Sequence, residues 1–190
     1  MKLLGKKLRI LILLLKKFFL RYLLPTSPET RKGIIEKNAM QIHQIIIKDL
    51  RRPNFSEHEF FVSDTAKKLG MDNYTDDLSI LTNLVILADK MQEIRDLLNM
   101  PIIISSAYRS PDLNKIVGGK PNSQHMEGMA CDFTCPRFGT PENIVRFLKE
   151  VGVEVDQCIV ENNSWVHISI KLENNRNEFL VFNKGKYSYV

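Results

Sequence analysis

The sequence predicts an α+β fold, and three observations support this prediction. The chain has 190 residues, which suits one compact domain with a modest tail. Short runs rich in β-branched residues have the length of strands, whereas longer amphipathic stretches have the length of helices. The two kinds of element do not alternate regularly, which favours α+β over a doubly wound sheet. We expect three parts, at residues 1–24, 25–53 and 54–190.

Residues 1–24 have the pattern of a basic amphipathic helix. The segment holds seven basic side chains and no acidic one; on a helical wheel these seven occupy one half and large apolar side chains the other. This pattern is typical of a helix on a membrane surface, where anionic lipid adds about 1 kcal/mol per basic residue. The alternatives are a helix packed on the domain or a partner chain, and a secretory signal or anchor. Pro25 and Pro28 end the helix and begin a linker.

Charge and cysteine content exclude two classes of protein. The net charge is +5, but without residues 1–24 the chain carries 20 basic and 22 acidic residues. The folded part therefore lacks the basic surface of a nucleic-acid-binding protein, and no nucleic-acid partner is expected. The three cysteines are odd in number and form no Cys-x-x-Cys pair, which excludes a full disulfide framework and indicates buried free thiols.

The first half of the chain after the tail is expected to be helical. Residues 30–50 place isoleucines among polar residues and predict a helix. Residues 55–71 indicate a loop with short helices. Residues 78–98 carry apolar side chains near helical spacing, with Thr75 or Asp76 as the N-cap. This long helix is expected to pack its apolar stripe on a sheet.

The second half is expected to supply that sheet. Its apolar runs are short and rich in β-branched residues, which indicates strands. Thr140, Pro141 and Gly152 have the positions of an N-cap, a first-turn proline and a glycine past the end of a helix. The expected elements are a buried strand at 102–106, a strand at 128–135, a helix at 140–152, a hairpin at 157–172 with Asn162 and Asn163 in its turn, and edge strands within 179–190.

Two polar residues interrupt strands that are otherwise apolar. Asp132 follows Met129-Ala-Cys, and His167 follows Trp165-Val. A lone buried carboxylate costs several kcal/mol unless it is paired or bound to a metal. His125, just upstream, offers a second imidazole. Two imidazoles and one carboxylate are a ligand set of catalytic zinc, with one position left open, so these three residues are predicted to bind Zn²⁺ together.

The motifs around these residues resemble those of a known family. The string SSAYRSPDLNKIVGGKPNSQHMEGMACDF at 105–133, followed by WVHIS at 165–169, is similar to the signature of the M15 peptidases. These are zinc D-Ala-D-Ala carboxypeptidases and related endolysin-type peptidases. The likeness covers about residues 54–170. It implies a small antiparallel sheet packed with helices, in an α+β fold shared with Hedgehog signalling domains.

The resemblance also implies an activity. It implies a zinc metallopeptidase that hydrolyses peptide bonds in peptidoglycan stem peptides, as a carboxypeptidase or an endopeptidase, with a phage lysis enzyme as a natural setting. The zinc ligands would be His125, Asp132 and His167. Arg109 would bind a substrate carboxylate or carbonyl oxygen, while Ser123 and Gln124 would line the cleft. The alternative is a non-catalytic zinc-binding relative that binds cell walls or serves as a structural virion protein.

One position departs from the family pattern. Many relatives place the general base, Glu or Asp, three residues before the last histidine, and this chain has Ser164 there. Serine cannot act as a base at neutral pH. The nearest upstream carboxylate is Glu161, which would share a face with His167 and act as the catalytic base if the turn has three residues. A turn of two or four residues would point Glu161 away, leaving another carboxylate as the base or an inactive site.

Overall fold

The computed structural model describes residues 28–190. The helix predicted for residues 1–24 lies outside this range. The chain divides into two compact units after Lys48. Helix α2 (Pro28–Leu50) confirms the helix predicted for residues 30–50. Within the described residues, no helix has the length and apolar content needed to cross a membrane.

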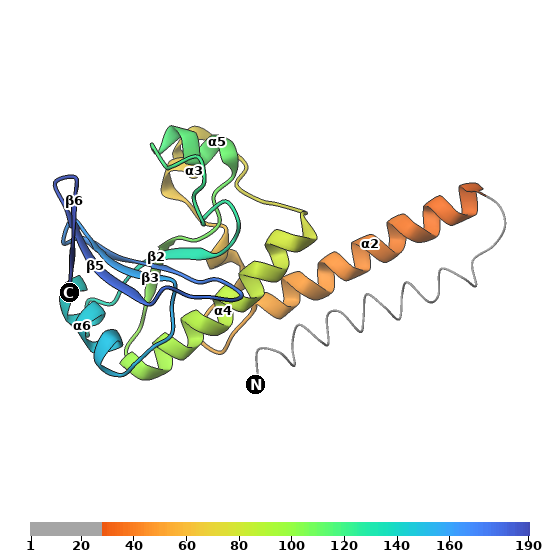
Figure 1. Cartoon of the computed structure of the whole chain (residues 1–190). Coiled ribbons are helices and arrows are strands. Elements are labelled where there is room, and N and C mark those ends of the chain that lie inside the picture. Colours follow the sequence, from red (N-terminus) through yellow and green to blue (C-terminus); the bar gives the residue numbers. More distant parts are fainter. Residues whose placement is uncertain (1–27) are drawn as a thin grey trace. The chain divides into compact units, whose positions relative to one another are not determined.

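Six strands form one sheet in the order β1-β2-β4-β3-β5-β6 (Figure 1). Every neighbouring pair is antiparallel except β3 and β5, which run parallel. The predicted α+β fold is confirmed, with this one parallel pair in an otherwise antiparallel sheet. The strands are β1 (Ile103–Ser106), β2 (Ala130–Thr134), β3 (Gln157–Glu161), β4 (Trp165–Ser169), β5 (Glu178–Asn183) and β6 (Lys186–Tyr189).

The helices of the second unit follow the predicted order. A short 3-10 helix and α3 confirm the short helices expected in residues 55–71, and a further short helix, α5, precedes β2. Helix α6 begins as predicted, because the Thr140 side chain accepts the backbone N–H of Asn143 and Pro141 occupies the first turn. These helices are η2 (Glu57–Phe60), α3 (Asp64–Leu69), α4 (Leu78–Leu98), α5 (Pro111–Ile116) and α6 (Pro141–Glu150).

The predicted N-cap of α4 was wrong. Asp77, not Thr75 or Asp76, precedes the first helical residue, and its carboxylate accepts the backbone N–H groups of Ser79 and Ile80. A cap must stand directly before the first turn to reach these donors. The Thr75 hydroxyl instead accepts the N–H of Asp77 at 3.2 Å, so it supports the cap rather than forming it.

The strand expected at 102–106 is not fully buried. β1 begins at Ile103 and forms an edge of the sheet, paired only with β2 among the described strands. The Ile103 side chain is 57% exposed, whereas Ile104 is 8% exposed. Successive side chains point to opposite faces, so an apolar run in an edge strand can still leave every second residue in water.

The two faces of the sheet have different roles. Cys131 and Phe133 on β2 point to one face and are fully buried, and α6 packs against β3, β4 and β5. Burial of a side chain as large as Phe133 contributes about 1.5–3 kcal/mol. The three cysteines are buried free thiols, as expected. Asp132 lies between Cys131 and Phe133 in sequence and therefore points to the opposite face.

Candidate metal centre

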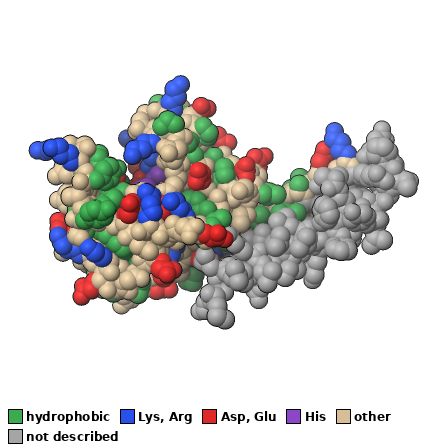
Figure 2. All heavy atoms as spheres, viewed as in Figure 1, with side chains coloured by type: hydrophobic (Ala, Val, Ile, Leu, Met, Phe, Trp, Pro, Cys, Tyr) green, Lys and Arg blue, Asp and Glu red, His purple; other side chains and the backbone are tan. Residues whose placement is uncertain are grey.

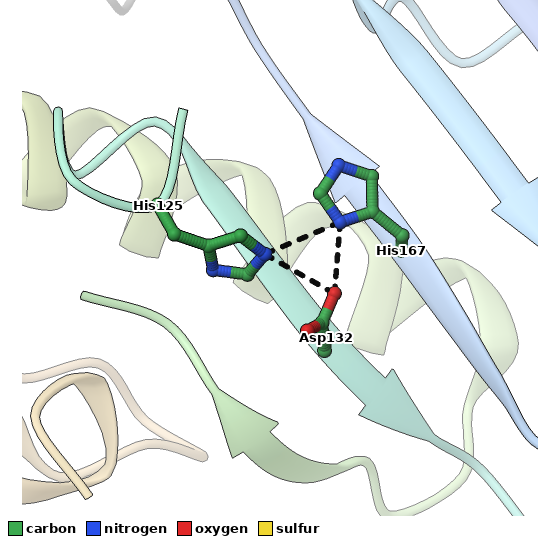
Figure 3. Close-up of side chains that lie close together, drawn as sticks. All are labelled: His125, Asp132 and His167. Atoms are coloured by element: carbon green, nitrogen blue, oxygen red, sulfur yellow. Dashed lines mark hydrogen bonds and ion pairs between the residues drawn. The ribbon is translucent and has the colours of Figure 1, made fainter. Parts of the chain in front are cut away.

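His125, Asp132 and His167 meet on one face of the sheet (Figure 3). Asp132 on β2 and His167 on β4 are direct partners in the antiparallel register, so their side chains share a face. His125 comes from the loop before β2. The distances between the three facing atoms are 2.8 Å from His167 Nδ1 to Asp132 Oδ1, 3.3 Å from His125 Nε2 to His167 Nδ1, and 3.3 Å from His125 Nε2 to Asp132 Oδ1.

The orientation of His125 is set by a backbone carbonyl. Its Nδ1 lies 2.7 Å from the carbonyl oxygen of Ala107, which can only accept a hydrogen bond, so Nδ1 carries the proton. The other ring nitrogen, Nε2, therefore presents a lone pair to His167 and Asp132. This arrangement is the usual support of a metal-binding histidine, because the hydrogen bond fixes both tautomer and ring direction.

The three atoms fit a tetrahedral metal ion. Zinc–ligand bonds of about 2.0–2.1 Å in tetrahedral geometry place neighbouring ligand atoms about 3.3 Å apart. The observed separations of 2.8–3.3 Å are close to this value. Three lone-pair-bearing atoms converge here, and they need a shared proton or a cation to remain so close. The donor set of two imidazoles and one carboxylate suits zinc with one coordination position open.

Burial and charge keep His125 and Asp132 in the forms that bind metals. Burial lowers the pKa of His125, which favours the neutral imidazole. Burial by itself would raise the pKa of Asp132, but the charges and hydrogen bonds of His125 and His167 hold that pKa well below its usual range. Neutral imidazole and ionised carboxylate are the ligating forms, so the site is prepared for a cation.

Arg109 contacts the ligand triad directly. Its Nη2 donates to Asp132 Oδ2, and its Nε donates to Ser106 Oγ at 2.9 Å. Oδ2 is the carboxylate oxygen that does not face the histidines, so the guanidinium holds Asp132 with Oδ1 turned toward them. Arg109 also lines the cleft described below. The role in substrate binding predicted for it stays a prediction.

A buried asparagine fixes the segment that carries Arg109. The Asn73 side chain donates from Nδ2 to the carbonyl oxygens of Phe61 and Tyr108, and its Oδ1 accepts the N–H of Ser110. Both chain neighbours of Arg109 are thus held by one side chain. Sequence reasoning missed Asn73 because its partners lie 12 to 37 residues away and no local motif marks it.

A cleft of about 830 Å³ opens over the triad. In Figure 2, histidine side chains are visible at the bottom of a hollow between the part that carries α3 and α5 and the β5–β6 hairpin. Ser123 and Gln124 line this cleft, where they were predicted to lie. The Gln124 amide nitrogen is also 3.2 Å from both Asp156 Oδ2 and the carbonyl oxygen of Ile170. Gln124 therefore connects the cleft lining to the residue directly before β3 and the residue directly after β4.

Glu161 lies on the same face as the triad. The β3–β4 turn has three residues, because Glu161 pairs with Trp165 and Ile159 pairs with His167. Asn162 and Asn163 adopt the left-handed conformation, at φ 49° and 55°, which asparagine tolerates better than most residues. Of the turn lengths of two, three and four residues that were considered, the three-residue turn is therefore present. Glu161 lines the cleft together with His167.

The surroundings of Glu161 differ from those of Ser164. Burial raises the pKa of the Glu161 carboxyl, which moves it toward the range useful for a general base at neutral pH. Ser164 is exposed in the turn, where its hydroxyl donates to the carbonyl oxygen of Asn162 at 3.2 Å. The serine at the position typical of the family base does not line the cleft that holds the metal ligands.

Asp156 is a buried acidic residue that sequence reasoning missed. It has 0% exposure, and Arg176 donates to both of its carboxylate oxygens. The Lys171 ammonium nitrogen Nζ lies 3.0 Å from Asp156 Oδ1, and the Gln124 amide donates to Asp156 Oδ2. Its position before the apolar run at residues 158–160 was the available signal, since a carboxylate there needs partners. Asp156 therefore anchors the wall of the cleft.

We expect Asp156→Asn to weaken the acid sensitivity of folding. Burial would raise the pKa of Asp156, but hydrogen bonds from Arg176 and Lys171 lower it below the usual value. The folded carboxylate thus stays ionised while the unfolded one gains a proton near pH 4, so its contribution exists above that pH and is lost as the pH falls. Between pH 6 and pH 3 the wild type should lose about 1 kcal/mol more unfolding free energy than the variant.

Urea unfolding at the two pH values measures this difference. Asp76→Asn, a change of an exposed carboxylate, is the matched control and should retain the wild-type pH dependence. An Asp156→Asn variant with the same acid dependence as the wild type would show that the carboxylate is not stabilised by its basic partners.

A comparison with protein families assigns the chain. The family model described as Peptidase M15 matches residues 53–169, more than half of the chain. The matched region includes the three ligand candidates and also Arg109, Ser123, Gln124 and Glu161. No curated protein matches the chain. The family consists of peptidases, and the chain belongs to the peptidase M15 family.

Proposed function

We propose that the protein is a zinc-dependent peptidase that hydrolyses peptide bonds in peptidoglycan stem peptides. The observation that carries this proposal is the convergence of three metal-ligand atoms beneath a cleft that Glu161 also lines. A metal-ligand triad, a carboxylate on the same face and an open cleft are the parts that hydrolysis of a peptide bond requires. Membership of a peptidase family supports the same reaction class.

His125, Asp132 and His167 would hold the zinc ion. When bound, zinc supplies a Lewis acid that polarises a carbonyl group and makes water more acidic. The Ala107 carbonyl and Arg109 would keep His125 and Asp132 in ligating orientation.

Glu161 would serve as the general base. In this proposal its carboxylate accepts a proton from the attacking water and then delivers that proton to the amine that leaves. Its half-buried position and raised pKa suit a group that must exist in both protonation states. The three-residue turn supports this role, because it directs Glu161 toward the cleft.

Three polar residues would position the substrate. Arg109 has five N–H groups, and two of its nitrogens donate to Ser106 and Asp132, so further donors are available for a substrate carbonyl or carboxylate oxygen. Ser123 and Gln124 would contact the peptide from the cleft floor. This arrangement suits either a carboxypeptidase or an endopeptidase.

Digestion of purified peptidoglycan tests the proposal. The zinc-loaded full chain should release peptide products, a chelator should stop the release, and added zinc should restore it. Mass spectrometry of the products separates the two reaction types, since a carboxypeptidase releases a terminal amino acid and an endopeptidase releases larger fragments. A protein that binds about one zinc ion per chain but cuts no stem-peptide bond would instead be a non-catalytic cell-wall-binding relative.

A membrane partner is a separate proposal. The basic amphipathic pattern of residues 1–24 would bring the enzyme to an anionic lipid surface. Co-sedimentation of the full chain with vesicles tests this idea, and equal binding to neutral and anionic vesicles would contradict it.

A further inference from the structure

Two segments that are distant in the sequence line the same cleft. The loop after α5 contributes Lys120, and the β5–β6 hairpin contributes Phe182 and Tyr187. The Lys120 ammonium nitrogen lies 5.9 Å from the centroid of the Tyr187 ring, a distance typical of a cation–π contact. The Tyr187 ring in turn packs against Phe182, with centroids 4.7 Å apart. The loop after α5 and the β5–β6 hairpin are thus in contact through Lys120 and Tyr187.

Lys120 differs from the other basic residues of the cleft. Arg109 pairs with Asp132, and Arg176 pairs with Asp156 and Glu178. None of the ion pairs formed among residues 28–190 involves Lys120. Burial raises the pKa of Glu161 in the cleft, and the charge of Lys120 acts against this rise. The cleft therefore contains a positive charge that has no carboxylate within ion-pair distance among the described side chains.

The backbone beside Lys120 is held in place. Asn114, which is 3% exposed, donates from its amide nitrogen to the carbonyl oxygen of Lys120 at 2.9 Å. The backbone carbonyl oxygen of Asn114 accepts the N–H of Gly119 at 2.8 Å. A Cβ atom on Gly119 would lie 2.0 Å from the Asn114 side chain, so only glycine permits this packing. The backbone at Lys120 is therefore held to α5 by hydrogen bonds from and to Asn114.

We infer that Lys120, supported by the ring of Tyr187, forms a subsite for a carboxylate group of an acidic peptide substrate. The inference rests on the proposed peptidase function and names the substrate class that the cleft selects. An unpaired ammonium group attracts an anion, and a carboxylate accepts its N–H groups in short charge-assisted hydrogen bonds. Tyr187 lies beyond residues 53–169, so this contact joins a residue of the family-matched region to one outside it.

Matched synthetic peptides test the subsite. In a set of stem peptides, each carboxylate in turn is replaced by a carboxamide, which keeps the shape and removes the charge. For the wild type, one such replacement should lower kcat/KM about fivefold, mainly through a higher KM, as expected for an exposed charge pair. The ratio of kcat/KM for the carboxylate peptide to kcat/KM for its carboxamide should fall to about one in Lys120→Met. This ratio should persist in Lys120→Arg and become smaller in Tyr187→Leu. Higher salt should also reduce the wild-type ratio.

Lys115→Met is the matched control, because Lys115 is exposed on α5 and does not line the cleft. It should retain the wild-type preference. A Lys120→Met variant with the wild-type ratio, or a wild type that ignores every carboxylate of the set, would overturn the subsite while leaving the peptidase activity intact. A zinc-loaded wild type that cleaves none of the peptides would overturn the proposed function, and the subsite with it.

Discussion

Replacing His125 with alanine is expected to reduce kcat/KM for peptide hydrolysis by at least about a thousandfold. The variant loses the Nε2 ligand and leaves two of the three converging atoms, Asp132 Oδ1 and His167 Nδ1. Two ligands hold zinc much more weakly than three, so the zinc content should fall from about one per chain to near zero after dialysis. Elemental analysis and peptide hydrolysis measure the two effects.

A second ligand variant and a control separate metal loss from misfolding. His125 is 3% exposed, so its removal also leaves a cavity and an unpaired carbonyl at Ala107. Asp132→Asn preserves the shape of the side chain while removing its charge, and it should cause the same loss of zinc. His58→Ala changes an exposed histidine and should alter neither quantity. Full zinc content in both ligand variants would refute the assignment of the metal site.

Replacing Glu161 with glutamine is expected to lower kcat about 10²–10⁴-fold while leaving the zinc content unchanged. The amide keeps the size of the side chain but cannot accept and return a proton. Because Glu161 lines the cleft without belonging to the ligand triad, the loss should fall on the chemical step rather than on metal binding. Steady-state kinetics together with metal analysis distinguish this variant from those of the ligands.

Glu154→Gln is the matched control for this variant. Glu154 is exposed ahead of β3, and its substitution makes the same chemical change outside the cleft. Its kcat should stay close to the wild-type value. If Glu161→Gln retains kcat within about threefold, another group must act as the base, because loss of general-base catalysis costs at least about a hundredfold.

The sequence predicted the secondary structure well where local signals were strong. Thr140, Pro141 and Gly152 marked helix α6, since capping and breaking residues act through their immediate neighbours. The same reasoning failed at the start of α4, where Thr75, Asp76 and Asp77 are all able to cap and only the last one is placed correctly. Competing local signals leave an uncertainty of one or two residues in an element boundary.

The candidate site was predicted in part. His125, Asp132 and His167 were recognised because polar residues inside apolar strands, set within a family motif, indicate a shared role. The pairing of Asp132 with His167 and their contact with His125 required the strand order of the sheet. The substrate-binding role expected for Arg109 stays a prediction, whereas no spacing rule could indicate its observed contact with Asp132.

The sequence by itself determined which residue types are available for metal binding, that Asp132 and His167 lie in strands, and to which family the motif is similar. The tertiary structure decided which of these side chains meet. Adding or removing a single residue in the β3–β4 turn would reverse the face to which Glu161 points, because strand side chains alternate with a period of two. The contacts of Lys120 with Tyr187 and of Gln124 with Asp156 join segments that are distant in sequence, so only the assembled sheet brings these side chains together.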